Sequence, residues 1–354
     1  FLTASTEAGI LLALAIGMLL VRPTPFKDSM RLARRWQWLA LLFIAVDLGR
    51  AASTLIPLTS PQIFQQSITT ADVIKAQPGD FRIYVDEDFD YNTKFNRFFR
   101  FDRFGPGTVE HWQQLKETLA PNLGVYADLP SANNDDPLTV GRWKSLIDAL
   151  DAAPPDQQRR LLGLMNVGYL LTGPHQVGPS SIYEQGEIVI QSIPDPLPRA
   201  YFVSAAGVVE NETAALARLM AADFDSRREV VIISEGLPGE AGDDSEPKID
   251  NDIFSSKVSV SQEGPNQVRL TLEAPAPGFV VLTDTFYPGW QALHNGQPAP
   301  ILPANLAFRA VAVEAGAHDI VFTYRPWSFT LGLWVSGFTW LAVVATAVIQ
   351  KIRE

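Results

Sequence analysis

The chain has 354 residues, a formal net charge of −11 and no cysteine, so a disulfide framework and a site built on a thiolate are both excluded. Most of the negative charge lies in residues 59–326, which hold 20 of the 28 basic and 35 of the 39 acidic residues. An acidic region of this kind argues against nucleic acid as a partner and against docking on anionic lipid.

Two apolar runs open the chain, at residues 1–21 and 36–58, and each predicts a transmembrane helix. A signal peptide is a poor interpretation of the first run, because no basic region precedes it and a second apolar run follows soon after. The chain begins with Phe rather than Met, so we expect it to be part of a longer protein.

The second run carries Asp47 and Arg50, which makes it marginal as a membrane span. Two such charges near a helix centre cost roughly 5–7 kcal/mol, whereas its ten Leu, Ile, Phe and Val residues contribute roughly 3–6 kcal/mol. The i, i+3 spacing allows the two side chains to pair on one helix face. The pair is either structural, within a helix bundle, or a polar site facing a membrane cavity, and both alternatives require neighbouring helices.

A third apolar run, residues 327–349, has no charge in 23 residues and predicts the last transmembrane helix. Basic residues gather in the loop at 22–35 and in the tail at 350–354. The positive-inside rule places both segments on the cytoplasmic side, so three crossings would put residues 59–326 on the extracytoplasmic side.

Residues 59–234 predict a mixed α/β region. Strands are expected at residues 81–85, 167–171, 201–203 and 229–234, and helices at residues 143–150, 154–164 and 212–222. An acidic linker rich in Gly, Pro and Asp follows at residues 235–252. From residue 253 to 326, six or more short strands alternate with turns, which predicts a sandwich-like, all-β subdomain. The fold class is thus a membrane protein fragment with three transmembrane α-helices, an α/β region and this subdomain.

The residues suited to chemistry are few. The four histidines are scattered without metal-ligand spacing, and no phosphate loop or nucleophile motif is present, so we assign neither a catalytic residue nor a metal site. Asp86, Asp88 and Asp90 alternate like calcium ligands, but Tyr91 stands where a calcium loop needs Gly and Arg97 where it needs Glu. A solvated strand edge is the alternative interpretation of the three aspartates.

The most distinctive string is Asp284-Thr-Phe-Tyr-Pro-Gly-Trp290. Its Asp284, Tyr287 and Trp290 surround a Pro-Gly turn and could stack on a sugar ring and hydrogen-bond to it. A structural corner with inward-packed aromatic side chains is the alternative. Arg309, at a strand position, is expected to pair with Asp284 or with Glu314.

These strings resemble a known family. The residues that carry the resemblance are Asp284-Thr-Phe-Tyr-Pro-Gly-Trp290, Gly296, Asn305, Phe308-Arg309-Ala310-Val311, Ala315-Gly316, His318 and Tyr324-Arg-Pro326 before the last membrane helix. Upstream strings of the same kind are Pro121-Asn122-Leu123-Gly124, Met165-Asn166-Val167-Gly168-Tyr169-Leu170-Leu171 and Pro198-Arg199-Ala200-Tyr201. In order and topology, roughly residues 35–350 resemble the YfhO-like bacterial membrane protein family.

The resemblance implies a polytopic membrane protein related to the C-type glycosyltransferases, which transfer a sugar from a polyprenyl-phosphate carrier outside the cytoplasmic membrane. The expected partners are then the lipid bilayer, the polyprenyl-phosphate sugar donor and an envelope polysaccharide or teichoic-acid-like acceptor. In such enzymes the catalytic acidic residue lies near the N-terminus, before the region seen here, so no catalytic residue carries over. Neither the residues nor the resemblance identifies a cofactor.

Two alternatives to the enzyme remain open from the residues. A non-catalytic, membrane-anchored envelope binding or scaffold protein would account equally well for the scarce polar constellations. A transporter component is supported only by the intramembrane pair Asp47 and Arg50.

Overall fold

The computed structural model describes residues 16–17, 30–55, 60–100, 103–104, 108–234 and 253–353. Contacts between residues divide the chain into two compact units. One comprises Phe1–Gln66 with Lys94–Leu115, and the other comprises Ser67–Thr93 with Lys116–Glu354.

The first unit is mainly helical. Its elements are α2 (Met30–Leu55), the 3-10 helix η1 (Pro61–Phe64), most of the π-helix η2 (Asn92–Phe98), a hairpin of β2 (Phe99–Arg100) and β3 (Arg103–Phe104), and most of α5 (Val109–Glu117). Ser60 caps η1 by accepting a hydrogen bond from the Gln62 N–H, and Pro61 occupies the first turn, where its missing donor costs nothing.

The prediction of three transmembrane helices is wrong. Among the described residues, one helix is long and apolar enough to cross a membrane, and it runs over Trp327–Ile352. Residues 36–55 of the predicted crossing at 36–58 lie in α2, which also takes in Arg31, Arg34 and Arg35 from the predicted cytoplasmic loop, and residues 56–58 lie outside the described residues. Asp47 and Arg50 both lie within α2, where each charge raises the cost of burying the helix in a bilayer. The crossing predicted at 1–21 lies outside the described residues, apart from residues 16–17.

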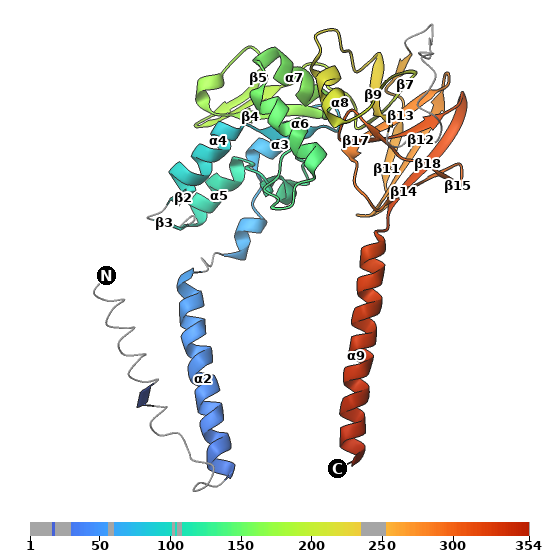
Figure 1. Cartoon of the computed structure of the whole chain (residues 1–354). Helices are drawn as coiled ribbons and strands as arrows, with labels where there is room; N and C mark the ends of the chain where they lie inside the picture. Colours follow the sequence, from blue (N-terminus) through green and yellow to red (C-terminus); the bar gives the residue numbers. More distant parts are fainter. Residues whose placement is uncertain are drawn as a thin grey trace. The chain divides into compact units, whose positions relative to one another are not determined.

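The candidate membrane helix is α9 (Trp327–Arg353), which continues from the last strand after Arg325 and Pro326 (Figure 1). Its apolar side chains, including Trp327, Trp334 and Trp340, are exposed along its length. A surface so large and uniformly apolar requires an apolar environment, which a bilayer provides.

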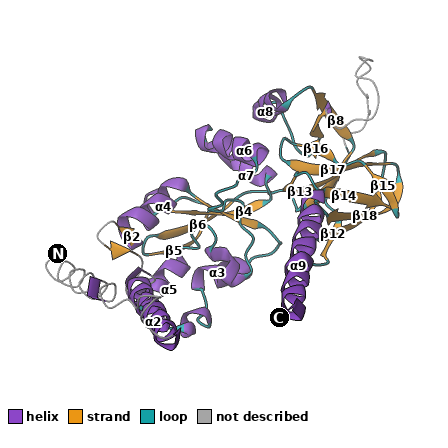
Figure 2. Cartoon of the chain, turned by 60° about the horizontal axis from the view of Figure 1, so that its bottom comes forward, coloured by secondary structure: helices purple, strands orange, loops and turns teal. Residues whose placement is uncertain are grey.

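In the second unit, a four-stranded sheet is covered on both faces (Figure 2). Its order is β1 (Arg82–Val85), β4 (Val167–Thr172), β6 (Ile188–Ser192) and β5 (Ser181–Gln185), with β1 and β4 parallel and the other pairs antiparallel. Alternate residues of β1 face opposite sides. Ile83 and Val85 pack with α3 (Thr69–Lys75) in one core, whereas Tyr84 packs with α6 (Gly141–Ala152) and α7 (Pro155–Leu164) in another.

A seven-stranded sheet shares that second core. Its order is β10 (Phe254–Ser255), β7 (Ala200–Val203), β13 (Gly278–Thr285), β17 (Phe308–Val313), β16 (Leu302–Ala304), β9 (Glu229–Ile233) and β8 (Ala205–Val209). The parallel pair β8 and β9 is connected by α8 (Glu212–Met220). The sheet therefore joins strands from both sides of the predicted linker at 235–252, which itself lies outside the described residues.

A five-stranded antiparallel sheet completes the sandwich. Its order is β11 (Ser259–Gln262), β12 (Gln267–Ala274), β18 (Gly316–Tyr324), β14 (Trp290–His294) and β15 (Gln297–Ala299). Phe202 and Leu282 from the seven-stranded sheet meet Leu270 and Phe322 from the five-stranded sheet in one buried core. The neighbouring Tyr201 points to the opposite side, toward the helices. The predicted sandwich is thus present, but it includes β7, β8 and β9 from before the linker.

The local elements expected in residues 59–234 are present within a residue or two of their predicted limits, but the segment at Asp86 differs. The predicted strand edge is wrong, because Asp86 accepts a hydrogen bond from the Phe89 N–H and so caps the short helix α4 (Glu87–Tyr91). Asp88 and Asp90 lie in that helix. In the part of the chain that the structure describes, no group of three or more His, Asp or Glu side chains is arranged to hold a metal ion.

Candidate functional site

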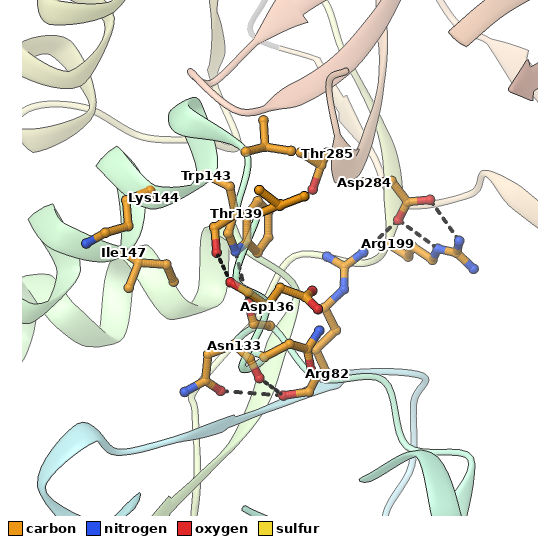
Figure 3. A pocket seen from close by; sticks show the side chains of 15 residues that line it. Arg82, Asn133, Asp136, Thr139, Trp143, Lys144, Ile147, Arg199, Asp284 and Thr285 are labelled. Carbon is orange, nitrogen blue, oxygen red and sulfur yellow. Dashed lines mark hydrogen bonds and ion pairs between the residues drawn. The ribbon is translucent and has the colours of Figure 1, made fainter. Parts of the chain in front are cut away.

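A cavity of about 520 Å³ opens in the second unit between the four-stranded sheet, α6 and the ends of β7 and β13 (Figure 3). Its lining combines polar and charged side chains with apolar ones. The lining residues are Arg82, Ser131, Ala132, Asn133, Asn134, Asp136, Leu138, Thr139, Val140, Trp143, Lys144, Ile147, Arg199, Asp284 and Thr285. A concave site with a few convergent polar groups is the usual form of a small-molecule or sugar site.

One wall of the cavity is a loop attached to the edge of β1. The Ile83 N–H donates to the Pro130 carbonyl at 2.9 Å, and the Ala132 N–H donates to the Ile83 carbonyl at 2.9 Å. The Asn133 side chain then imitates a strand partner, since it donates to the Val85 carbonyl at 2.7 Å and accepts from the Val85 N–H at 3.0 Å. These bonds fix the backbone of an otherwise irregular segment beside the cavity.

The aromatic part of the lining is Trp143, on α6. Its indole N–H donates to the Ala132 carbonyl at 3.0 Å, and its ring lies 6.1 Å from the Phe308 ring, measured between centroids. The side chain is only partly buried, so part of the ring faces the cavity. An indole held in this way offers an apolar surface on which a sugar ring can stack.

The mouth of the cavity carries solvent-exposed polar side chains. Asn134, Asp136 and Thr139 are exposed, and the Thr139 hydroxyl donates to the Asp136 carbonyl at 3.0 Å. Lys144, one turn into α6, pairs with Asp148 at the i, i+4 spacing. These amide, carboxylate and hydroxyl groups can exchange water for the hydroxyls of a carbohydrate.

The opposite wall is an ion cluster around Asp284. Arg199 holds the carboxylate through two atoms, with Nε 3.1 Å from Oδ1 and Nη2 2.8 Å from Oδ2. Arg82 Nη2 donates to Oδ1 at 2.6 Å, and Arg309 Nη2 donates to Oδ2 at 3.2 Å. One partly buried carboxylate thus accepts four hydrogen bonds from three guanidinium groups, and charge-assisted bonds of this kind are among the strongest hydrogen bonds in proteins.

Arg82 connects the two sheets that border the cavity. Its Nη1 donates to the Met165 carbonyl, the Thr283 carbonyl and the Thr283 hydroxyl, each at 3.0 Å. Arg82 begins β1, whereas Thr283 and Asp284 lie near the end of β13. The cavity is therefore bordered by a fixed junction between the four-stranded sheet and the seven-stranded sheet.

The charges of the cluster shift one another's pKa values. Burial by itself raises the pKa of Asp284, but the hydrogen bonds from Arg199 and the charges of Arg82, Arg199 and Arg309 outweigh it, so the net pKa is lowered. Burial lowers the pKa of Arg82, and it lowers that of Arg309 to about 10. The carboxylate therefore stays ionised, and the excess positive charge is carried by partly desolvated arginines.

Arg309 is the most deeply buried member of the cluster, with 1% of the residue exposed. Its guanidinium carbon lies 3.9 Å from the centroid of the Trp290 ring and 5.1 Å from that of Phe322, so it stacks between two aromatic rings. Its Nε and Nη1 make no hydrogen bond within the described residues. Of the two partners expected for Arg309, the structure selects Asp284.

The four residues predicted to bind a ligand lie close together, but they differ in their contacts and in whether they line the cavity. Asp284 lines the cavity, Arg309 lies behind it, and Trp290 packs against Arg309 and the sandwich core. Tyr287 is 46% exposed and does not line the cavity. The contacts of Asp284, Trp290 and Arg309 are those of a structural corner, and ligand contact at the turn stays a prediction.

The other predicted polar pair belongs to the first unit. Asp47 is partly exposed on α2, and the side chain of Arg50 lies outside the described residues. Among the described residues, only Trp327–Ile352 is a candidate span, so the structure does not identify the pair as intramembrane.

Sequence reasoning missed most of the cavity. In the sequence, Arg199 stands out only within the string Pro198-Arg199-Ala200-Tyr201, and Arg82 only as part of a predicted strand. The polar run Asn133-Asn134-Asp135-Asp136 before a helix was a usable signal, because such a run on an irregular segment often lines a site. No local sequence pattern indicated that this polar run lies beside Arg82, Arg199 and Asp284.

The described residues define a protein with one candidate membrane helix and a β-rich unit that carries a cavity lined by polar groups and a tryptophan. Residues 249–336 match the family model described as bacterial membrane protein YfhO. This match confirms the resemblance for the C-terminal strands and the start of α9. The upstream strings at 121–124, 165–171 and 198–201 lie outside the matched residues, and their resemblance stays a prediction. No curated protein and no solved structure matches the chain.

Proposed function

We propose that this chain is the C-terminal part of a bacterial membrane protein whose water-exposed unit binds a cell-envelope carbohydrate acceptor. The observation that supports this most directly is the cavity bordered by Trp143, Asp136 and Asn134. It combines a partly open indole ring with exposed amide and carboxylate groups. Apolar stacking together with several hydrogen-bonding groups is what a sugar ring requires.

The charges at the end of the chain support an extracytoplasmic position for the β-rich unit. Lys351 and Arg353 lie at the C-terminal end of α9, and the positive-inside rule places them in the cytoplasm. The β-rich unit at the other end of α9 would then face the extracytoplasmic side, where envelope polymers are found.

The proposed reaction is transfer of a sugar from a polyprenyl-phosphate donor to the bound acceptor. It needs a carboxylate base for the acceptor hydroxyl and positive groups near the departing phosphate. We assign these groups to the membrane part of the longer protein rather than to the cavity. In the alternative, a scaffold protein, the same cavity binds the polymer without any transfer.

Binding by the 354-residue chain in lipid nanodiscs tests the proposal. The probes are fragments of a neutral envelope polysaccharide and a polyol-phosphate polymer, measured by calorimetry. The double variant Asn134→Ala with Asp136→Asn removes exposed groups from the cavity mouth without touching the ion cluster. Glu273→Gln, an exposed carboxylate-to-amide change on β12, is the matched control.

We expect the double variant to weaken binding about tenfold, as expected for the loss of one or two hydrogen bonds, and the control to bind like the parent chain. Absence of binding to both probes by the folded parent chain would contradict the proposal. Equal affinity of the parent chain and the double variant would show that the mouth of the cavity is not the binding site. Binding without sugar transfer by the longer protein would favour the scaffold.

A further inference from the structure

We propose that the aromatic turn of residues 286–290 lies in the headgroup layer of the membrane and contacts lipid directly. This interfacial turn is a second contact between the β-rich unit and the bilayer, besides α9. The inference rests on the membrane anchoring by α9 that is part of the proposed function, and it is independent of carbohydrate binding.

The interfacial turn is bonded to the segment that leads into α9. The Arg325 N–H donates to the Gly289 carbonyl at 2.8 Å. Gly289 has a φ of +105°, and a Cβ on it would lie 3.0 Å from the Tyr324 ring and 3.1 Å from the Pro326 side chain. The turn is therefore held against the residues that immediately precede the helix, whatever the direction in which α9 leaves.

The length of α9 determines the depth of its first residues. The 26 residues from Trp327 to Ile352 form a helix of about 39 Å, compared with a hydrocarbon core of about 30 Å. A centred helix then extends about 4–5 Å beyond the core at each end, into the headgroup layer. Because Gly289 contacts Pro326, the interfacial turn lies at the same depth as the start of the helix.

The side chains of the turn suit this layer. The Tyr287 and Trp290 rings lie 6.4 Å and 5.3 Å from the Tyr324 ring, so the three form one aromatic cluster. Tyr287 is 46% exposed and Trp327 is 76% exposed. Tyrosine and tryptophan are enriched at membrane interfaces, because their rings are apolar and their polar atoms can stay hydrated.

An apolar groove adjoins the interfacial turn and points to the same environment. It has a volume of about 410 Å³, and its lining includes Phe286, Tyr287, Pro288, Leu293 and Ile301. No charged side chain belongs to its lining. The negative charge of residues 59–326 disfavours attraction to anionic lipid, so the contact depends on aromatic and apolar burial rather than on charge.

The chain has no cysteine, so single cysteines can report depth. The variants Tyr287→Cys, Leu293→Cys and Ala317→Cys are labelled with a fluorophore in phosphatidylcholine nanodiscs that contain headgroup spin-labelled lipid. Leu293 pairs with Val321 and Trp290 with Tyr324, so Leu293 lies about 10 Å farther along the strand. Ala317, near the other end of β18, lies about 24 Å from Tyr324.

We expect quenching to decrease in the order 287, 293, 317, with about threefold more quenching at 287 than at 317. The order should persist at high salt, since charge does not drive the contact. Val343→Cys within α9, with lipid spin-labelled on its acyl chain, checks the anchoring separately. Quenching at 343 with equal quenching at 287 and 317 would overturn the inference and leave the anchoring intact. Absence of quenching at 343 would overturn the anchoring, and the inference with it.

Discussion

Arg309 and Trp290 form a stacked pair, with the guanidinium carbon 3.9 Å from the indole centroid, at the point where the ion cluster meets the sandwich core. The same guanidinium reaches Asp284 at 3.2 Å. The string that contains Asp284 and Trp290 therefore connects the cavity wall to the corner beside α9. We therefore expect Asp284, Trp290 and Arg309 to affect both the stability of the fold and the geometry of the cavity.

Asp284 is the negative centre on which the cluster depends. Replacing it by Asn should destabilise the 354-residue chain by about 3–5 kcal/mol, because the buried Arg309 and the mostly buried Arg82 and Arg199 would be left without a counter-charge. Urea unfolding in detergent, followed by near-UV circular dichroism, measures the loss. Asp223→Asn is the control, since that carboxylate pairs with Arg218 at the surface, and its unfolding midpoint should barely move. Similar losses for the two variants would contradict the central role of Asp284.

Arg309 should be more replaceable than its partner. Arg309→Met removes two nitrogen atoms that lack hydrogen-bond partners within the described residues, and it leaves Asp284 bound to Arg82 and Arg199. Methionine also keeps apolar contact with Trp290 and Phe322. We expect Arg309→Met to cost at least about 2 kcal/mol less than Asp284→Asn in the same unfolding experiment. An equal or larger cost would mean that the stacked cation is itself essential.

Two glycines should respond in opposite ways to alanine. A Cβ on Gly278 would lie 2.6 Å from the Val203 carbonyl oxygen and 2.7 Å from the Phe202 ring, both in the packed sheet. Gly278→Ala should therefore destabilise the chain by about 1–3 kcal/mol. Gly141, the first residue of α6, has nothing within 4 Å of such a Cβ, and Gly141→Ala should be neutral or stabilising by up to about 1 kcal/mol. Thermal unfolding of both variants in parallel is sufficient, and a loss at Gly141 matching that at Gly278 would refute the steric argument.

The pair His294 and His318 should make stability depend on pH. Their rings share a hydrogen bond of 2.7 Å between Nε2 and Nδ1, and His318 Nε2 lies 2.8 Å from the Glu314 carbonyl oxygen. Partial burial and the charge of His318 lower the pKa of His294 below 6.5. The unfolded chain therefore binds the proton more readily, so this contribution to stability is complete above pH 6.5 and is lost as the pH falls through the lower, folded-state pKa.

Unfolding midpoints between pH 7.5 and 5.5 measure this loss. His294→Gln keeps a donor for His318 but cannot titrate, so its midpoint should change less over the same interval. A parent chain and variant with parallel pH profiles would show that the pair does not contribute.

Some features of this protein were determined by the sequence alone. The uncharged run at 327–349 required an apolar environment, and it forms α9. The alternation of Val268, Leu270 and Leu272 predicted a strand with one buried face, and these three side chains lie in the sandwich core. Both are local patterns, since a helix or strand responds to the spacing of its own apolar residues.

Only the tertiary structure decided the site and the composition of the sheets. Asp284 meets Arg82 and Arg199 across 202 and 85 residues, and no periodicity reports a contact of that range. Likewise β7 pairs with β13 and β10 across the linker, because a sheet adds strands by backbone hydrogen bonds that are independent of sequence order. The apolar run of α2 is interrupted by Asp47 and Arg50, and among the described residues only Trp327–Ile352 is a candidate span. The spacing of apolar residues along the chain determines which face of a helix or strand is apolar. Tertiary packing determines which element covers that face and which charged side chains meet at the edge of the sheet.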